Sequence, residues 1–179
     1  MLILPIKGNY PVFRVINLFC LILYLSACVG RDLEITAKFD PREAAFVKNG
    51  GSAKLSGQAF MRQNGGGVVT CAGEEVNLFP ATKYATERFA KIYGDVSGGR
   101  INVFQGVSLK GVPPEYLQYR RVATCDAEGD FEFTGIAPGT YYVQSRVLWM
   151  VPNSYFPEGG SVAKRITLRS GQRLRVLLN

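Results

Sequence analysis

Short runs in which apolar and polar residues alternate, separated by turn residues, fill most of the chain. In "LEITAKF", residues 33–39, every second residue is apolar, which predicts a strand with one buried face that Asp40-Pro41 ends. Further strand candidates lie at 53–60, 64–79, 101–104, 116–125, 130–136, 140–149, 163–169 and 173–179. Many short strands with regular turn signals predict a mainly β protein, a single antiparallel β-sandwich or barrel.

One segment has a helical period instead. In "ATKYATERFAKIYG", Ala85, Phe89, Ile92 and Tyr93 fall on one helix face, and Gly94 suits the left-handed residue that ends a helix. We therefore predict one short inserted helix from about Thr82 to Tyr93, packed on one end of the sandwich. Its charged side is expected to face water; this side holds Lys83, Glu87, Arg88 and Lys91.

The apolar run from Val15 to Leu25 follows Lys7 and Arg14 and is shorter than the roughly 20 residues of a membrane-spanning helix. It ends in Leu25-Ser26-Ala27-Cys28, which resembles the lipobox of bacterial lipoproteins. The resemblance implies that residues 1–27 are a signal peptide, that Cys28 is acylated, and that the protein is tethered to the cell envelope by lipid. Because no aspartate follows Cys28, it further implies the outer membrane, facing the periplasm.

The amino-acid composition limits the reactions and metal sites that we expect of the chain. The chain has no histidine, which removes Ser-His-Asp and Cys-His catalysis and His-ligated zinc sites. We therefore expect no enzyme activity, no metal and no cofactor. Carboxylate chemistry at Glu74-Glu75 or at Asp126, Glu128 and Asp130 is the remaining enzymatic alternative, but these residues lie in predicted turns.

The net charge limits the possible partners, and the cysteine content predicts a disulfide. The net charge of +7 comes from scattered basic residues, so nucleic-acid binding is not expected, whereas an anionic glycan, a lipid headgroup or an acidic protein face stays open. With Cys20 in the signal and Cys28 acylated, Cys71 and Cys125 remain in an exported domain, which predicts a disulfide. A redox-active pair is the alternative, although Cys-x-x-Cys spacing is absent.

The stretch "TCDAEGDFEFTGIAPGTYYVQSRV", residues 124–147, carries the second resemblance. Its Asp-x-x-Gly-x-Phe-x-Phe core and Pro-Gly-x-Tyr turn resemble the carboxypeptidase regulatory-like, or transthyretin-like, β-sandwich family. The resemblance covers residues 52–179, after an N-terminal tether and first strand at 28–51, and it is interrupted by an insertion at about 80–121. It implies a non-catalytic module, and it places Cys71 and Cys125 at the ends of neighbouring strands.

The first functional hypothesis is therefore a structural or protein-interaction module that binds another envelope protein. Aromatic and arginine side chains anchor such interfaces. The candidate partner contacts are Tyr84, Arg88, Tyr93, Tyr116, Tyr119 and Arg120 in the insertion, and Trp149, Tyr155 and Phe156 in a later loop.

The alternatives are a carbohydrate-binding module and a lipoprotein of a secretion-system membrane complex. Planar aromatic rings on a β-sandwich can stack against sugar rings. Exposed, coplanar Trp149 and Tyr155 would favour the carbohydrate module, and burial of both would favour a protein partner.

Overall fold

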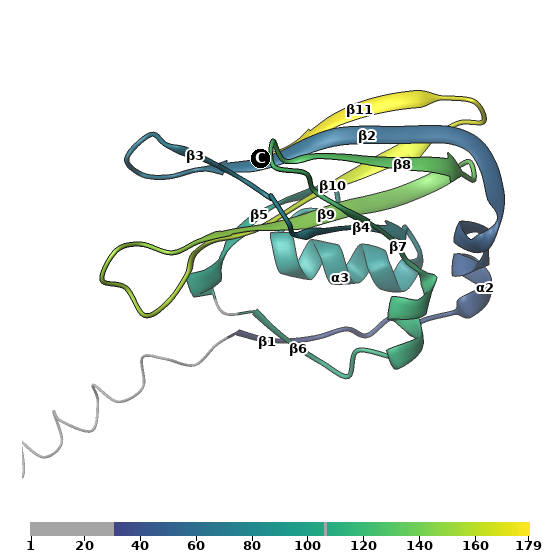
Figure 1. Cartoon of the computed structure of the whole chain (residues 1–179). Helices are drawn as coiled ribbons and strands as arrows, with labels where there is room; N and C mark the ends of the chain where they lie inside the picture. Colours follow the sequence, from purple (N-terminus) through teal and green to yellow (C-terminus); the bar gives the residue numbers. More distant parts are fainter. Residues whose placement is uncertain (1–30, 106) are drawn as a thin grey trace, which may run out of the picture. The chain divides into compact units, whose positions relative to one another are not determined.

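The computed structural model describes residues 31–105 and 107–179, which form two packed β-sheets with a helix on the outer face of one of them (Figure 1). The predicted signal peptide and Cys28 lie outside the described residues. Within the described part, no helix has the length and apolar character needed to cross a membrane.

The central sheet has the strand order β5-β10-β9-β4-β7. Its strands are β5 (Gly98–Asn102), β10 (Glu158–Leu168), β9 (Gly139–Trp149), β4 (Glu75–Pro80) and β7 (Arg121–Thr124). All pairings in this sheet are antiparallel. β5 belongs to the predicted insertion, so the insertion contributes an edge strand as well as the helix.

The second sheet is built around the long strand β2 (Gly50–Arg62). β8 (Asp130–Ile136) and β3 (Val68–Thr70) pair with β2 in the antiparallel sense, whereas the closing strand β11 (Arg173–Leu178) runs parallel to it. The predicted mainly β sandwich with one inserted helix is confirmed, with this parallel pairing added to its antiparallel strands.

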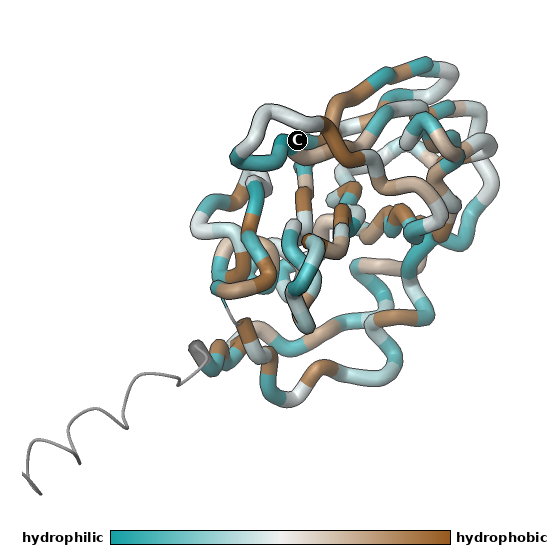
Figure 2. Tube along the Cα trace, turned by 60° about the vertical axis from the view of Figure 1, so that its left-hand side comes forward, coloured by the Kyte–Doolittle hydropathy of each residue, from teal (hydrophilic) through white to brown (hydrophobic). Residues whose placement is uncertain are grey.

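The two sheets enclose one apolar core. Alternate residues of facing strands point into it, among them Leu55, Leu78, Phe131, Tyr141 and Val143, all of which are buried. The alternation is visible as brown segments that recur along the strands (Figure 2). Because the side-chain period of a strand is two, the residues between them face the other side of the sheet.

The outer face of the central sheet is also buried. Phe79 of β4 and Tyr142 of β9 point toward α3 (Lys83–Tyr93) and η4 (Pro114–Tyr119). The Phe89 and Tyr142 rings stack with centroids 4.1 Å apart, and Phe79 stacks on Tyr116 at 4.9 Å. The insertion therefore supplies a third layer that removes this face from water.

The helix begins and ends where the sequence predicts. The Thr82 hydroxyl accepts a hydrogen bond from the Ala85 amide at 3.1 Å and caps the first turn. Gly94, at φ 81°, ends the helix in the left-handed conformation. The predicted apolar face is buried at Ala85 and Phe89, together with Tyr84.

The prediction that the charged side of α3 faces water is wrong in part, because a strap covers it. The strap comprises residues 31–39: β1 (Arg31–Glu34), paired in parallel with β6 (Val107–Lys110), and the extended residues that follow. Of the predicted strand at 33–39, only Leu33 and Glu34 belong to β1, since the chain then leaves β6 to reach α2 (Pro41–Ala44) and η2 (Ala45–Lys48).

Glu87 holds the strap against α3. Its carboxylate accepts hydrogen bonds from the amides of Thr36 at 2.9 Å and Ala37 at 2.7 Å. Lys91 forms an ion pair with Glu87 at 2.7 Å and also donates to the Glu34 carbonyl. The Lys91 hydrogen bond, followed by those from the Thr36 and Ala37 amides, lowers the pKa of Glu87 to about 2.

We predict that Glu87→Gln loosens the strap without unfolding the sandwich. The amides of Thr36 and Ala37 should exchange hydrogen faster in the variant, and Glu132→Gln, an exposed change on β8, serves as the control. Because the pKa of Glu87 is depressed on folding, its stabilising effect is present above about 4.5 and is lost as the pH falls toward about 2. Equal exchange rates in both variants would contradict this account.

Candidate functional site

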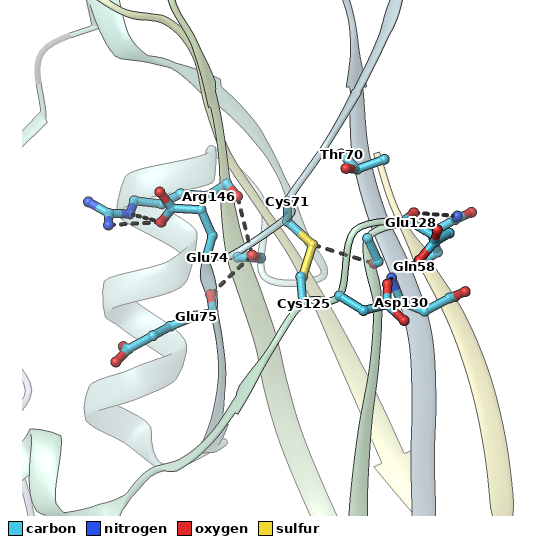
Figure 3. Close-up of a disulfide and its surroundings, with 12 residues drawn as sticks. Gln58, Thr70, Cys71, Glu74, Glu75, Cys125, Glu128, Asp130 and Arg146 are labelled. Atoms are coloured by element: carbon cyan, nitrogen blue, oxygen red, sulfur yellow. Dashed lines mark hydrogen bonds and ion pairs between the residues drawn. A yellow bond between two sulfur atoms is a disulfide. The ribbon is translucent and has the colours of Figure 1, made fainter.

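The predicted disulfide is present and ties the two sheets together. Cys71 follows β3, Cys125 follows β7, and their Cα atoms lie 5.8 Å apart (Figure 3). Both residues are buried, and backbone hydrogen bonds hold the segment in place: the Gly73 amide donates to the Cys125 carbonyl, and the Cys125 amide donates to the Glu74 carbonyl. The pair is thus embedded in the fold.

We predict that replacing Cys71 and Cys125 together with serine lowers the free energy of unfolding by about 4 kcal/mol, because the bridge closes a long loop in the unfolded chain. The sequence separation is 54 residues. Urea denaturation of the oxidised protein and the double variant would measure the loss. A difference below about 1 kcal/mol, a quarter of the expected value, would contradict a structural role.

Most of the carboxylates considered for catalysis are engaged in other contacts. Glu74 forms an ion pair with Arg146 at 2.9 Å (Figure 3), and Asp130 forms one with Arg175 at 2.9 Å. The Asp126 carboxylate accepts a hydrogen bond from the Asp130 amide at 2.7 Å and shapes the turn before β8. In residues 31–105 and 107–179, no three His, Cys, Asp or Glu residues come together as a metal site.

Two of the predicted partner contacts are wrong. Tyr84 is 2% exposed and Tyr116 is 0% exposed, and their rings meet with centroids 4.9 Å apart in the layer beneath the strap. Phe39 of the strap packs edge-on against both rings. These side chains bury the outer face of the central sheet and cannot reach a partner.

The other insertion candidates are tied into the same layer. The Arg88 guanidinium lies over the Tyr116 ring, 5.4 Å from its centroid. The Tyr93 hydroxyl forms a 2.7 Å hydrogen bond with the Ser161 hydroxyl, and burial raises the pKa of Tyr93 to about 12. Both side chains are thus packed inside the protein, although one terminal nitrogen of the Arg88 guanidinium is buried without a hydrogen-bond partner among the described residues.

Tyr119 and Arg120 follow the same pattern. The Lys48 ammonium lies over the Tyr119 ring at 3.8 Å from the centroid. Arg120 donates to the Asn77 side chain at 2.7 Å and lies 3.7 Å from the Glu75 carboxylate. Both residues are half-buried, so neither presents a freely exposed side chain to a partner.

The loop between β9 and β10 is different, because its aromatic residues are exposed. Tyr155 is 95% exposed and Phe156 is 70% exposed. Trp149, at the end of β9, is half-buried and packs against Gly159, where an added Cβ would lie 2.8 Å from the indole ring. Trp149 and Tyr155 are thus neither both exposed nor both buried.

A polar hollow opens beside this loop. The end hollow, as we name it, has a volume of about 290 Å³. It is lined by Met61, Arg62, Asn64, Arg100, Asn102, Phe104, Trp149, Glu158 and Gly159. The residues come from the end of β2, from β5 with η3 (Val103–Gln105), and from the ends of β9 and β10, so three separate parts of the chain meet there.

The charged groups of the end hollow are available to a ligand. Among the described residues, neither the Arg62 nor the Arg100 guanidinium has an ion pair or a hydrogen bond to another side chain. The Asn102 side-chain oxygen accepts a hydrogen bond from the Phe104 amide at 2.8 Å, which fixes the orientation of Asn102. The hollow therefore combines two cations, one carboxylate, two amides and two aromatic rings.

An apolar patch adjoins the end hollow and shares Phe104 with it. A second hollow is lined by Val103, Phe104, Phe156 and Pro157. We define the apolar patch as these four residues together with Met150 and Tyr155 of the same loop. Phe104 is 69% exposed and Met150 is 62% exposed. Of the partner contacts predicted from the sequence, Tyr155 and Phe156 lie in this patch.

The sequence did not reveal the other lining residues. Arg62, Asn64, Arg100 and Asn102 are separated along the chain and carry no motif, and they meet only because β5 adds to the edge of β10. Phe104 is the last residue of the predicted strand at 101–104, where an aromatic residue is ordinarily buried, but β5 ends at Asn102 and Phe104 lies in η3. The short apolar run "INVF" beside glycines was the one available signal.

A comparison with solved structures finds a protein with a similar fold. No family model matches the chain, and no curated protein matches it. The fold is similar to the crystal structure of a "putative carbohydrate binding protein" from Pseudomonas aeruginosa, with a TM-score of 0.66 and 27% sequence identity. The match covers 79% of this chain and 97% of that one. The chain therefore shares its β-sandwich fold with that protein.

Proposed function

We propose that this chain is a non-catalytic, lipid-anchored module of the bacterial cell envelope that binds an acidic saccharide in the end hollow. The single observation that carries the proposal is the pairing of two guanidinium groups, Arg62 and Arg100, with amide and aromatic side chains in one hollow. The similarity to a protein described as a carbohydrate binder supports the same class of ligand.

The chemistry of the hollow suits a sugar that carries carboxylates. Guanidinium groups bind carboxylates through paired, charge-assisted hydrogen bonds, so Arg62 and Arg100 would bind uronate groups. Asn64, Asn102 and Glu158 offer donors and acceptors for hydroxyl groups. The Phe104 ring gives the apolar face against which a sugar ring can pack.

The protein-interaction role, our first hypothesis from sequence, loses most of its support. Its contact set was concentrated in the insertion, and there Tyr84 and Tyr116 are buried. The remaining candidates Tyr155 and Phe156 are exposed in the β9–β10 loop, and Phe156 lines a hollow together with Phe104, which also lines the end hollow. The binding surface thus shifts to the loop end of the sandwich.

We predict that the protein binds oligogalacturonate more tightly than its methyl ester, which has the same rings without the charges. Calorimetric titration of both ligands would measure the difference. Changing Arg62 and Arg100 together to glutamine should weaken binding of the acid at least tenfold, which corresponds to about 1.4 kcal/mol, because two charge-assisted contacts are removed.

Changing Arg169 and Arg173 together to glutamine is the matched control, since both are exposed arginines at the β10–β11 turn, at the opposite end of β10 from Glu158. It removes the same charge and should leave the affinity unchanged. Equal binding of the acid and its ester, or equal weakening by the control and the variant of Arg62 and Arg100, would contradict the proposed site. Binding of neither ligand would reject acidic saccharides as the ligand class.

The lipid anchor has its own test. We predict that protein recovered from bacterial membranes begins at Cys28 and carries acyl chains there, because Leu25-Ser26-Ala27-Cys28 follows a signal-like apolar run. Mass spectrometry of the amino-terminal peptide would show it, and Cys28→Ser should release the protein from the membrane fraction. An unmodified amino terminus upstream of residue 28 would contradict the anchor.

A further inference from the structure

We propose that the apolar patch is a membrane-docking surface, which inserts into the interface of the bilayer that carries the lipid anchor. The proposal rests on the lipid anchor at Cys28 and is independent of saccharide binding. Four large side chains of the patch are exposed to solvent: Phe104 is 69% exposed, Met150 62%, Tyr155 95% and Phe156 70%. Phe104 and Phe156 line one hollow, Met150 and Tyr155 belong to the same loop as Phe156, and exposed apolar side chains that gather in this way mark a binding surface.

The patch lies at the end of the fold where the chain would leave for the membrane. Arg31, the first residue of β1, is paired with Val107, and Val107 is two positions after Gln105, the last residue of η3. Since β1 and β6 run in parallel, both strands lead away from the η3 end. In Figure 1 the start of β1 and the β9–β10 loop lie on the same side of the molecule.

The tether allows little freedom. Arg31 is three positions after Cys28, and three residues span at most about 11 Å. An acylated Cys28 would thus hold the start of β1 close to the bilayer surface. The strap is fixed to α3 by Glu87 and Lys91, so the domain cannot move away from the bilayer by unwinding the strap at low cost.

The composition of the patch suits the interface region of a bilayer. Phenylalanine, methionine and tyrosine side chains bury their apolar parts among acyl chains, while tyrosine keeps its hydroxyl among headgroups. Arg62 and Arg100 line the adjoining end hollow, where they would meet anionic headgroups or a saccharide at that level. Two signals, the acyl chains and the patch, would then fix the orientation of the domain.

Spin labelling of the mature lipoprotein tests the proposal directly. With Cys28 acylated and Cys71 bonded to Cys125, a cysteine introduced by Tyr155→Cys is the free thiol to which a nitroxide attaches. The matched control is Gln118→Cys, because Gln118 is exposed on η4, which packs beside α2 at the far end of the strap. Met150→Cys is a second reporter within the patch.

The labelled proteins are reconstituted in vesicles of phosphatidylethanolamine and phosphatidylglycerol, and collision rates with oxygen and with a water-soluble nickel chelate are measured. We expect the ratio of oxygen to nickel collisions to be several-fold higher at positions 155 and 150 than at 118. Changing Phe104 and Phe156 to serine should move the label at 155 toward the value at 118.

The possible results separate the explanations. Aqueous values at 155 and 150 on a chain whose Cys28 is acylated would overturn the docking surface and leave the anchor standing. Protection of 155 from both oxygen and nickel would mean that a protein, such as a second copy, covers the patch, which also overturns the proposal. An unmodified Cys28, seen by mass spectrometry of the same samples, would reject the anchor and the docking surface together.

Discussion

The central sheet must be buried on both faces, and the rest of the structure depends on this constraint. Tyr141 of β9 points into the sandwich core, and its neighbour Tyr142 stacks on Phe89 of α3. A two-layer sandwich would leave Tyr142 and Phe79 in water. The insertion supplies the missing cover, and for that reason the aromatic side chains of α3 and η4 in this layer, Tyr84, Phe89 and Tyr116, are core residues that a partner cannot reach.

Two links hold the layers together and leave the loop end free for binding. The Cys71–Cys125 bridge joins the second sheet to the central sheet, and Glu87 joins the strap to α3. The β9–β10 loop and η3 take part in neither link. Their apolar side chains are exposed, and the charged side chains of the end hollow lie beside them. Since Phe104 lines both the end hollow and the apolar patch, the proposed saccharide site would open at the rim of the proposed membrane face.

Local patterns predicted the elements well, whereas the site depended on contacts that no local pattern encodes. The period of α3 and its ends at Thr82 and Gly94 follow from capping and from the spacing of Ala85 and Phe89. The identity of the exposed aromatic residues did not follow, because Tyr84 and Tyr155 have the same chemistry and differ only in what packs over them. Arg62 and Arg100 meet through the pairing of β5 with β10, which sequence alone could not assign.

The central claim is that ligands bind at the loop end of the sandwich and not at the layer formed by α3 and η4. Hydrogen–deuterium exchange of the protein with and without oligogalacturonate tests it most directly, because one experiment reads every segment. The account predicts protection in residues 62–64, 100–105 and 149–159 and unchanged exchange in 83–93 and 114–121. Protection confined to the two latter segments would contradict it.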